Sequence, residues 1–289
     1  MPALPTPPAR EAGPMHPFDE ATALAGARGD VRRGRTSDAY WTFIGPFGGA
    51  SAATALRAVL EHPDRDGDPL AVTVNFCAPI ERGEYRVHVR RARANRSSQH
   101  WQVEFRQGAS DDAVLTASIV TAVRRESWHH QPVRPPELPP FEALPAFDNR
   151  RSLSWVAQYG FRFADGIPAL SEQGIAEPPR SARSLLWLQD AEPRPLDFLS
   201  LLAMSDAFFG RIFQVIGRIP PFGTVSMTTH FHAAADELAA HGEAPLAGLA
   251  DARVFHRSFC DQSVELYGRD GQLLATSHQV AFFRVQPSR

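Results

Sequence analysis

One acidic side chain stands out because its neighbours along the chain are apolar. A helix is predicted from about Pro195 to Gly217, and Asp206 is the only charged member of its apolar face. That face comprises Leu199, Leu202, Asp206, Phe209, Phe213 and Ile216. The polar residues expected on the opposite side are Ser200, Arg211, Gln214 and Arg218. A buried carboxyl group has a raised pKa unless donors compensate, so Asp206 could accept a proton near neutral pH. The alternative is a structural carboxylate paired with an arginine or exposed at a domain edge.

Several other chemistries are excluded by residue type. All 30 basic residues are arginine, so a Walker phosphate loop, a pyridoxal Schiff base and a protein-kinase site cannot be built. The motifs of serine hydrolases, zinc proteases and dinucleotide-binding folds are also missing. His230 and His232 alternate along one predicted strand, but no third metal ligand follows at a suitable spacing. We therefore expect neither a metal nor a cofactor.

The composition is that of a folded protein, and its charges do not indicate a surface that binds a charged partner. The 289 residues are 43% hydrophobic and 21% charged, with a net charge of −2, and no basic stripe suggests nucleic acid as a partner. Cys77 and Cys260 are expected to be buried thiols in a reduced compartment. Prolines occupy the N-terminal segment where a secretory signal would be apolar, and no membrane span is predicted. These features predict a cytoplasmic location.

The chain reads as two similar units joined by a proline-rich connection, whose densest part is 131–145. We predict an N-terminal domain over 15–128, a linker over 129–150 and a C-terminal domain over 151–286. The first unit has a helix from Gly49 to Leu60 and then strands near 70–77, 84–91, 99–106 and 113–124. The second has the helix named above and strands near 224–232, 249–256, 260–267 and 272–284. A helix followed by antiparallel strands, given twice, predicts an α+β fold of two tandem curved sheets, each wrapping a helix.

Five segments follow one another in a specific order: WTFIGPFGG at 41–49, ANRSSQHWQVEFRQG at 94–108, AMSD at 203–206, TVSMTTHFH at 224–232 and LATSHQ at 274–279. Taken together, they resemble the TesB-like proteins of the acyl-CoA thioesterase II family. The resemblance covers about 18–285 and implies a double hotdog fold. It also implies hydrolysis of acyl-CoA to a fatty acid and coenzyme A, a place in fatty acid metabolism and a homo-oligomer, either a dimer or larger.

The same resemblance implies catalytic roles for Asp206, Thr224 and Gln279. Ser226 and Met227 depart from the family pattern, in which an Asp-His pair is common at this place. A thioester needs little acid assistance, because its thiolate leaving group comes from a thiol with a pKa of about 8.5. Asp206 would then take a proton from water, while the Thr224 hydroxyl and the Gln279 amide hold that water in line.

The thioester carbonyl must also be polarised, and a helix start supplies N–H donors for this purpose. We expect Gly48 and Gly49 to form that start and to let the substrate approach closely. The alternative is that these glycines only allow the helix to pack tightly against the sheet.

The duplication allows the two units to be compared. Placing Thr116 on Thr276 puts Gln279 over Ile119, and placing Val225 on Val72 puts Thr224 over Ala71. The first unit is apolar at both positions, so we expect the second unit to carry the reacting groups. Two other functions stay open at this point: a non-catalytic acyl-CoA or lipid binder, and a 2-enoyl-CoA hydratase, although the Asp/His loop that such an enzyme needs is not visible.

Overall fold

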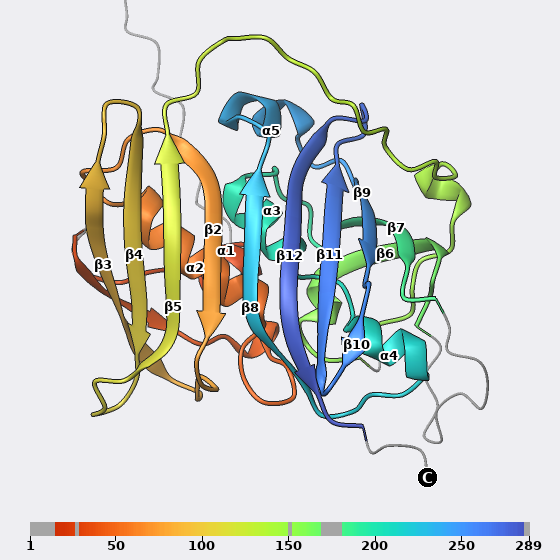
Figure 1. Cartoon of the computed structure of the whole chain (residues 1–289), viewed down its shortest axis with the longest axis horizontal. Coiled ribbons are helices and arrows are strands. Elements are labelled where there is room, and N and C mark those ends of the chain that lie inside the picture. Colours follow the sequence, from red (N-terminus) through yellow and green to blue (C-terminus); the bar gives the residue numbers. More distant parts are fainter. Residues whose placement is uncertain (1–14, 27–28, 150–151, 169–180, 286–289) are drawn as a thin grey trace, which may run out of the picture.

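A computed structural model describes residues 15–26, 29–149, 152–168 and 181–285. Within them, one antiparallel sheet runs across the molecule in the order β1-β3-β4-β5-β2-β8-β12-β11-β9-β7-β6, with β10 beside β11 (Figure 1). The N-terminal proline-rich segment and the predicted domain limits at 150, 151 and 286 lie outside the described residues. The predicted domain division therefore stays a prediction.

The elements of the two halves follow the predicted order. The first half contains α1 (Pro17–Ala21), β1 (Val31–Arg35), a 3₁₀ turn (Asp38–Tyr40), α2 (Gly48–Leu60), β2 (Asp68–Phe76), β3 (Glu84–Ala94), β4 (Ser98–Arg106) and β5 (Ala113–Ala122). The second half contains 3₁₀ turns (Phe141–Ala143, Val156–Gln158), β6 (Tyr159–Asp165), β7 (Ser184–Asp190), α3 (Phe198–Met204), α4 (Arg211–Ile216), β8 (Phe222–Phe231), α5 (Ala235–His241), β9 (Leu246–Asp251), β10 (Phe255–His256), β11 (Phe259–Tyr267) and β12 (Leu273–Phe283). The predicted strands are present, except that the single strand expected over 249–256 is divided into β9 and β10. Strands β1, β6 and β7 and helices α1 and α5 were not predicted.

The two halves join where β2 pairs with β8. Outward from this pair, the strand order is β2, β5, β4, β3, β1 on one side and β8, β12, β11, β9, β7, β6 on the other. Helices α2 and α3 contact each other and lie on the same face of the sheet (Figure 1). Alanine side chains make up much of the buried surface of α2, which lets the helix lie close both to the sheet and to α3. The C-terminal end of α3 therefore meets the N-terminal end of the other half's helix.

The prediction of a single long helix over 195–217 is wrong. The chain forms α3 and α4 instead, with Asp206 just beyond the end of α3. The Ser205 hydroxyl donates to the Leu202 carbonyl at 2.8 Å and lies 3.0 Å from the Thr229 hydroxyl, which draws the backbone into a turn. The apolar stripe is thus divided between two helices, and Asp206 occupies the bend between them.

The polar residues expected on the solvent side of that helix are partly buried as well. Ser200, Arg211 and Gln214 are all buried, and Arg211 is only 1% exposed. The Arg211 guanidinium donates to the Phe209 and Ala182 carbonyls and to the Ser184 hydroxyl. Carbonyl acceptors thus replace the water that this side chain was expected to meet.

A β-bulge in each half shows which first-half residue corresponds to Thr224. Strand β2 has an irregularity between Pro69 and Ala71, where Leu70 lacks a partner on β5. Strand β8 has the same feature at Val225 opposite β12. Superposing the two bulges places Thr224 on Pro69, so the predicted match to Ala71 is wrong by two residues. Side chains of a strand alternate with a period of two, so a shift by two residues keeps the same face inward and leaves the hydrophobic pattern unchanged. The sequence pattern therefore did not reveal this difference.

The predicted match of Gln279 to Ile119 agrees with the same superposition. Gln279 pairs with Met227 across β12 and β8, and Ile119 pairs with Val72 across β5 and β2. The bulge superposition also places Met227 on Val72. Both first-half counterparts, Pro69 and Ile119, are apolar, so the expected asymmetry between the halves holds.

The proline-rich connection crosses from one half to the other, arching over the end of the sheet from β5 (Figure 1). Beyond the connection, Trp155 stacks on Phe47 with ring centroids 4.6 Å apart, and the Ser154 hydroxyl accepts from the Trp41 backbone N–H at 3.0 Å. These contacts fix the segment that leads into α2.

Cys260 is buried as predicted, whereas Cys77 is exposed and that prediction is wrong.

Candidate active site

The structure brings Asp206, Thr224 and Gln279 together from three separate elements. The Gln279 Nε2 atom donates to Asp206 Oδ1 at 2.7 Å. The Thr224 hydroxyl donates to Gln279 Oε1 at 3.2 Å. Asp206 and Thr224 are partly exposed, while Gln279 is buried. A carboxylate, an alcohol and an amide thus form one hydrogen-bonded group that solvent can reach.

The N-terminus of α2 completes this group. Gly49 donates its backbone N–H to the Asp206 carboxyl group, and the Phe47 side chain, at the N-cap, makes no capping hydrogen bond. Asp206 therefore supplies, from the other half of the molecule, the oxygen that a capping residue normally provides. The partial positive charge of the helix start favours the ionised carboxylate.

Two opposing effects set the proton affinity of Asp206. Burial raises the pKa of Asp206 from 3.8 to about 7, even though the hydrogen bonds from Gln279 and Gly49 lower it. The effect of desolvation on the pKa is the larger one, because the carboxylate loses its hydrating water and gains only a few hydrogen-bond donors. Asp206 can therefore exchange a proton near neutral pH, as a general base must.

Gly48 is held close to the carboxylate. An added Cβ at Gly48 would lie 2.7 Å from Asp206 Oδ2 and 3.2 Å from the Phe76 ring. At Gly49 it would lie 2.6 Å from the Ala203 carbonyl oxygen. The glycine pair therefore permits the approach of Asp206 and the close packing of α2 on α3. The expected role of Gly48 and Gly49 in polarising the thioester carbonyl stays a prediction.

Gly48→Ala is expected to lower kcat by about 100-fold, because the new methyl group displaces the carboxylate by a distance that a reacting geometry does not tolerate. Stability should change little, because alanine is the better helix residue. Gly29→Ala is the matched control, because nothing lies within 4 Å of a Cβ at Gly29. Steady-state kinetics and thermal melts check both variants. Wild-type turnover in Gly48→Ala would show that the placement of Asp206 at α2 is not needed.

One member of the site was missed from the sequence. Gln262 on β11 is buried, and its Nε2 atom donates to Gln279 Oε1 at 3.2 Å. Its own Oε1 accepts the Arg211 backbone N–H at 2.6 Å. The available signal was a polar residue at a position where the strand alternation required an inward side chain.

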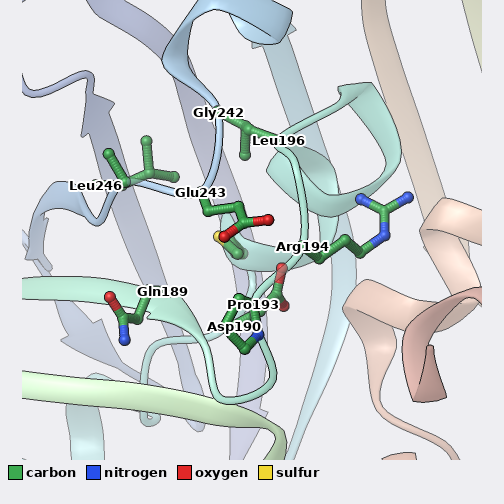
Figure 2. A pocket seen from close by; sticks show the side chains of 10 residues that line it. Gln189, Asp190, Pro193, Arg194, Leu196, Gly242, Glu243 and Leu246 are labelled. Carbon is green, nitrogen blue, oxygen red and sulfur yellow. The ribbon is translucent and has the colours of Figure 1, made fainter.

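A second buried carboxyl group lies apart from this network. Asp190 on β7 is 7% exposed, and burial raises its pKa to about 7. It lines a cavity of about 120 Å³ together with Arg194 and Glu243 (Figure 2). None of Asp206, Thr224 and Gln279 lines this cavity.

The other candidate ligands do not converge. His230 and His232 are both exposed, and His232 Nε2 lies 3.1 Å from the Thr276 hydroxyl. Across the described ranges, no group of three or more His, Cys, Asp or Glu side chains could hold a metal ion. Within the same part of the chain, no helix has the length and apolar character needed to cross a membrane.

Comparison with solved structures defines the class of fold. A conserved protein of unknown function with a hot dog fold from Alicyclobacillus acidocaldarius is 36% identical, with a TM-score of 0.87 over 94% of this chain and 100% of that one. A putative thioesterase II from Thermobifida fusca YX is 19% identical, with a TM-score of 0.79 over 94% and 99%. The acyl-CoA thioesterase II TesB2 from Mycobacterium marinum is 16% identical, with a TM-score of 0.72 over 93% and 98%. Together with the sheet order, they establish the predicted double hotdog fold.

Family models match both halves of the sequence. The acyl-CoA thioesterase N-terminal domain matches residues 37–123, and the acyl-CoA thioesterase C-terminal domain matches residues 132–283. No curated protein matches the sequence. The chain belongs to the acyl-CoA thioesterase family and is a thioester hydrolase, as the resemblance implied.

Proposed function

We propose that this protein hydrolyses acyl-CoA to a free fatty acid and coenzyme A by means of a water molecule that Asp206 activates. The observation that carries the proposal is the hydrogen bond from Gln279 Nε2 to a carboxyl group with a pKa near 7, at the start of α2. In the proposed step, the water oxygen bonds to the thioester carbon and its proton passes to Asp206. The carbon–sulfur bond then breaks, and the thiolate leaves with the bonding electrons.

Thr224 and Gln279 hold the water in this proposal. The Gln279 Nε2 atom donates to Asp206 and, at 3.6 Å, to the weak acceptor Met227 Sδ, which the water oxygen would replace, and the Thr224 oxygen keeps a lone pair after donating to Gln279. A water between them would be oriented with one proton toward Asp206. Such positioning reduces the entropy that the reaction must otherwise lose.

The thioester carbonyl is assigned to the start of α2. Because the Gly49 N–H already donates to Asp206, we assign the carbonyl contact to the Gly48 N–H. A donor there would stabilise the negative charge that develops on the carbonyl oxygen. The absence of a side chain at Gly48 lets Asp206 lie beside this N–H.

The proposal predicts a specific pH dependence. Only ionised Asp206 accepts a proton, so kcat/KM should rise as the pH increases and level off above an apparent pKa of about 7. The neighbouring Tyr159 does not titrate in this range, because burial raises its pKa well above 10. Free thiol released from acyl-CoAs of several chain lengths is measured between pH 5 and 9. A flat or falling profile, or no released thiol, would contradict the proposal.

The same assay separates the two rival functions. Tight acyl-CoA binding without thiol release would indicate a binding protein, and absorbance loss of an enoyl thioester without thiol release would indicate a hydratase. The cytoplasmic location, the role in fatty acid metabolism and the homo-oligomer, a dimer or larger, stay predictions. Sedimentation of the purified protein measures the last of these.

A further inference from the structure

The orientation of the Gln279 amide is central to the site. Its Nε2 atom donates to Asp206 Oδ1 at 2.7 Å and to the weak acceptor Met227 Sδ at 3.6 Å, and its Oε1 atom accepts from both Thr224 and Gln262. A glutamine amide is nearly symmetric in shape, so rotation by half a turn would exchange the two ends. The rotated amide would turn an oxygen lone pair toward the carboxylate and would remove the donor from Asp206.

Thr224 alone does not fix this orientation. A hydroxyl group donates or accepts by rotating its hydrogen, so Thr224 would satisfy either end of the Gln279 amide. Gln262 is different, because its Oε1 accepts from the Arg211 backbone N–H, and a backbone N–H is only a donor. That contact leaves the Gln262 Nε2 facing Gln279, and an amide nitrogen also only donates.

The first half of the molecule has no amide side chains at the two positions that correspond to Gln262 and Gln279. Gln262 pairs with Gln279 across β11 and β12, as Trp101 pairs with Ile119 across β4 and β5. Trp101 and Ile119 are fully buried, and neither side chain carries an amide. The same strand pairing therefore forms without amides at these positions, and the buried amides of the second half need another reason.

We propose that Gln262 is a positioning residue: it passes the fixed direction of the Arg211 N–H through two amides to Asp206. The chain of donors runs from Arg211 N to Gln262 Oε1, from Gln262 Nε2 to Gln279 Oε1, and from Gln279 Nε2 to Asp206 Oδ1. This inference rests on the proposed function for its effect on turnover. Its effect on the Asp206 carboxyl group is independent of turnover.

The test compares Gln262→Met with the wild type and with Gln99→Met. Gln99 is a buried glutamine on β4 that bonds the backbone of Asp64 and Asp66, so its variant reports the cost of losing such an amide elsewhere. We expect Gln262→Met to lower kcat about tenfold with KM nearly unchanged, since one hydrogen bond is lost. In Gln99→Met, we expect a comparable loss of thermal stability with unchanged kcat.

Asp206 is also titrated directly, by NMR of ¹³C-labelled aspartate assigned with Asp206→Asn. Its midpoint should move to higher pH in Gln262→Met, because the donor spends less time facing it. A further fall in kcat, larger than the product of the single effects, is expected when Thr224→Val is added, because both restraints on Gln279 Oε1 are then lost.

An unchanged Asp206 titration in Gln262→Met would overturn the inference, whatever Asp206→Asn does to turnover. A shifted titration with unchanged kcat would overturn the positioning role as well. If Gln262→Met does not fold, Gln262→Asn, which keeps the amide but shortens its reach, is judged by the same two readouts. Failure of the proposed function would appear separately, as an active Asp206→Asn enzyme.

Discussion

Asp206→Asn is expected to lower kcat by about 1000-fold, within the range that a general base contributes. Asparagine keeps the size of the side chain but accepts no proton at these pH values. Binding of a non-hydrolysable acyl-CoA analogue should remain within a few-fold, because the variant alters the reacting group and leaves the fold in place. Released thiol and calorimetric binding measure the two quantities. A variant with wild-type turnover would eliminate Asp206 as the base.

The same variant should be more stable than the wild type at high pH. Burial raises the pKa of Asp206 from 3.8 in the unfolded chain to about 7 in the fold. The stability contributed by this group is thus fully present below pH 3.8 and is lost as the pH rises through 7. Asparagine avoids that loss, so the melting temperature of the variant relative to the wild type should increase between pH 5 and pH 8.

Asp190→Asn is the matched control, because Asp190 is also buried with a pKa raised to about 7. It should show the same pH-dependent gain in melting temperature, since desolvation is the main cause in both groups. Its kcat should stay near that of the wild type, because Asp190 lines a separate cavity (Figure 2). Equal losses of kcat in the two variants would mean that burial of a charge, and not proton transfer by Asp206, limits turnover.

Gln279→Met is expected to lower kcat by about 100-fold, because both water positioning and the donor to Asp206 are lost. The midpoint of the pH profile should move upward, since the Gln279 hydrogen bond lowers the pKa of Asp206. The variant should also lose about 1–3 kcal/mol of stability, because Gln262 and Thr224 are left without their acceptor. Kinetics from pH 5 to 9 and denaturant unfolding measure these effects.

Gln102→Met provides the comparison for this variant, because Gln102 is an exposed strand glutamine of the first half. It should leave kcat, the pH midpoint and stability essentially unchanged. A Gln279→Met profile with the wild-type midpoint would show that the amide does not favour the ionised form of Asp206.

The repeated order of strands could be predicted from the sequence, because each strand and turn is specified by residues close together in the chain. The alternation of inward and outward residues predicts strands such as β4 and β11, and turn-forming residues mark their ends. Strand β6, at the edge of the sheet, and its neighbour β7 were not predicted, since they fall beyond the proline-rich connection and outside the predicted repeat. The break between α3 and α4 was also not predicted. It results from hydrogen bonds of Ser205 with Leu202 and with Thr229, and Thr229 lies on a separate strand.

The sequence by itself determined the two-unit α+β organisation, and the resemblance to the thioesterases singled out Asp206, Thr224 and Gln279. Only the tertiary structure decided that these groups meet, that Asp206 caps α2 of the other half by accepting the Gly49 N–H, and that the Gln262 amide donates to Gln279. The physical reason is that a hydrophobic period specifies which face of an element is buried, whereas hydrogen bonds between distant segments depend on strand register, bulges and helix ends. Those features exist only once the two halves have packed together.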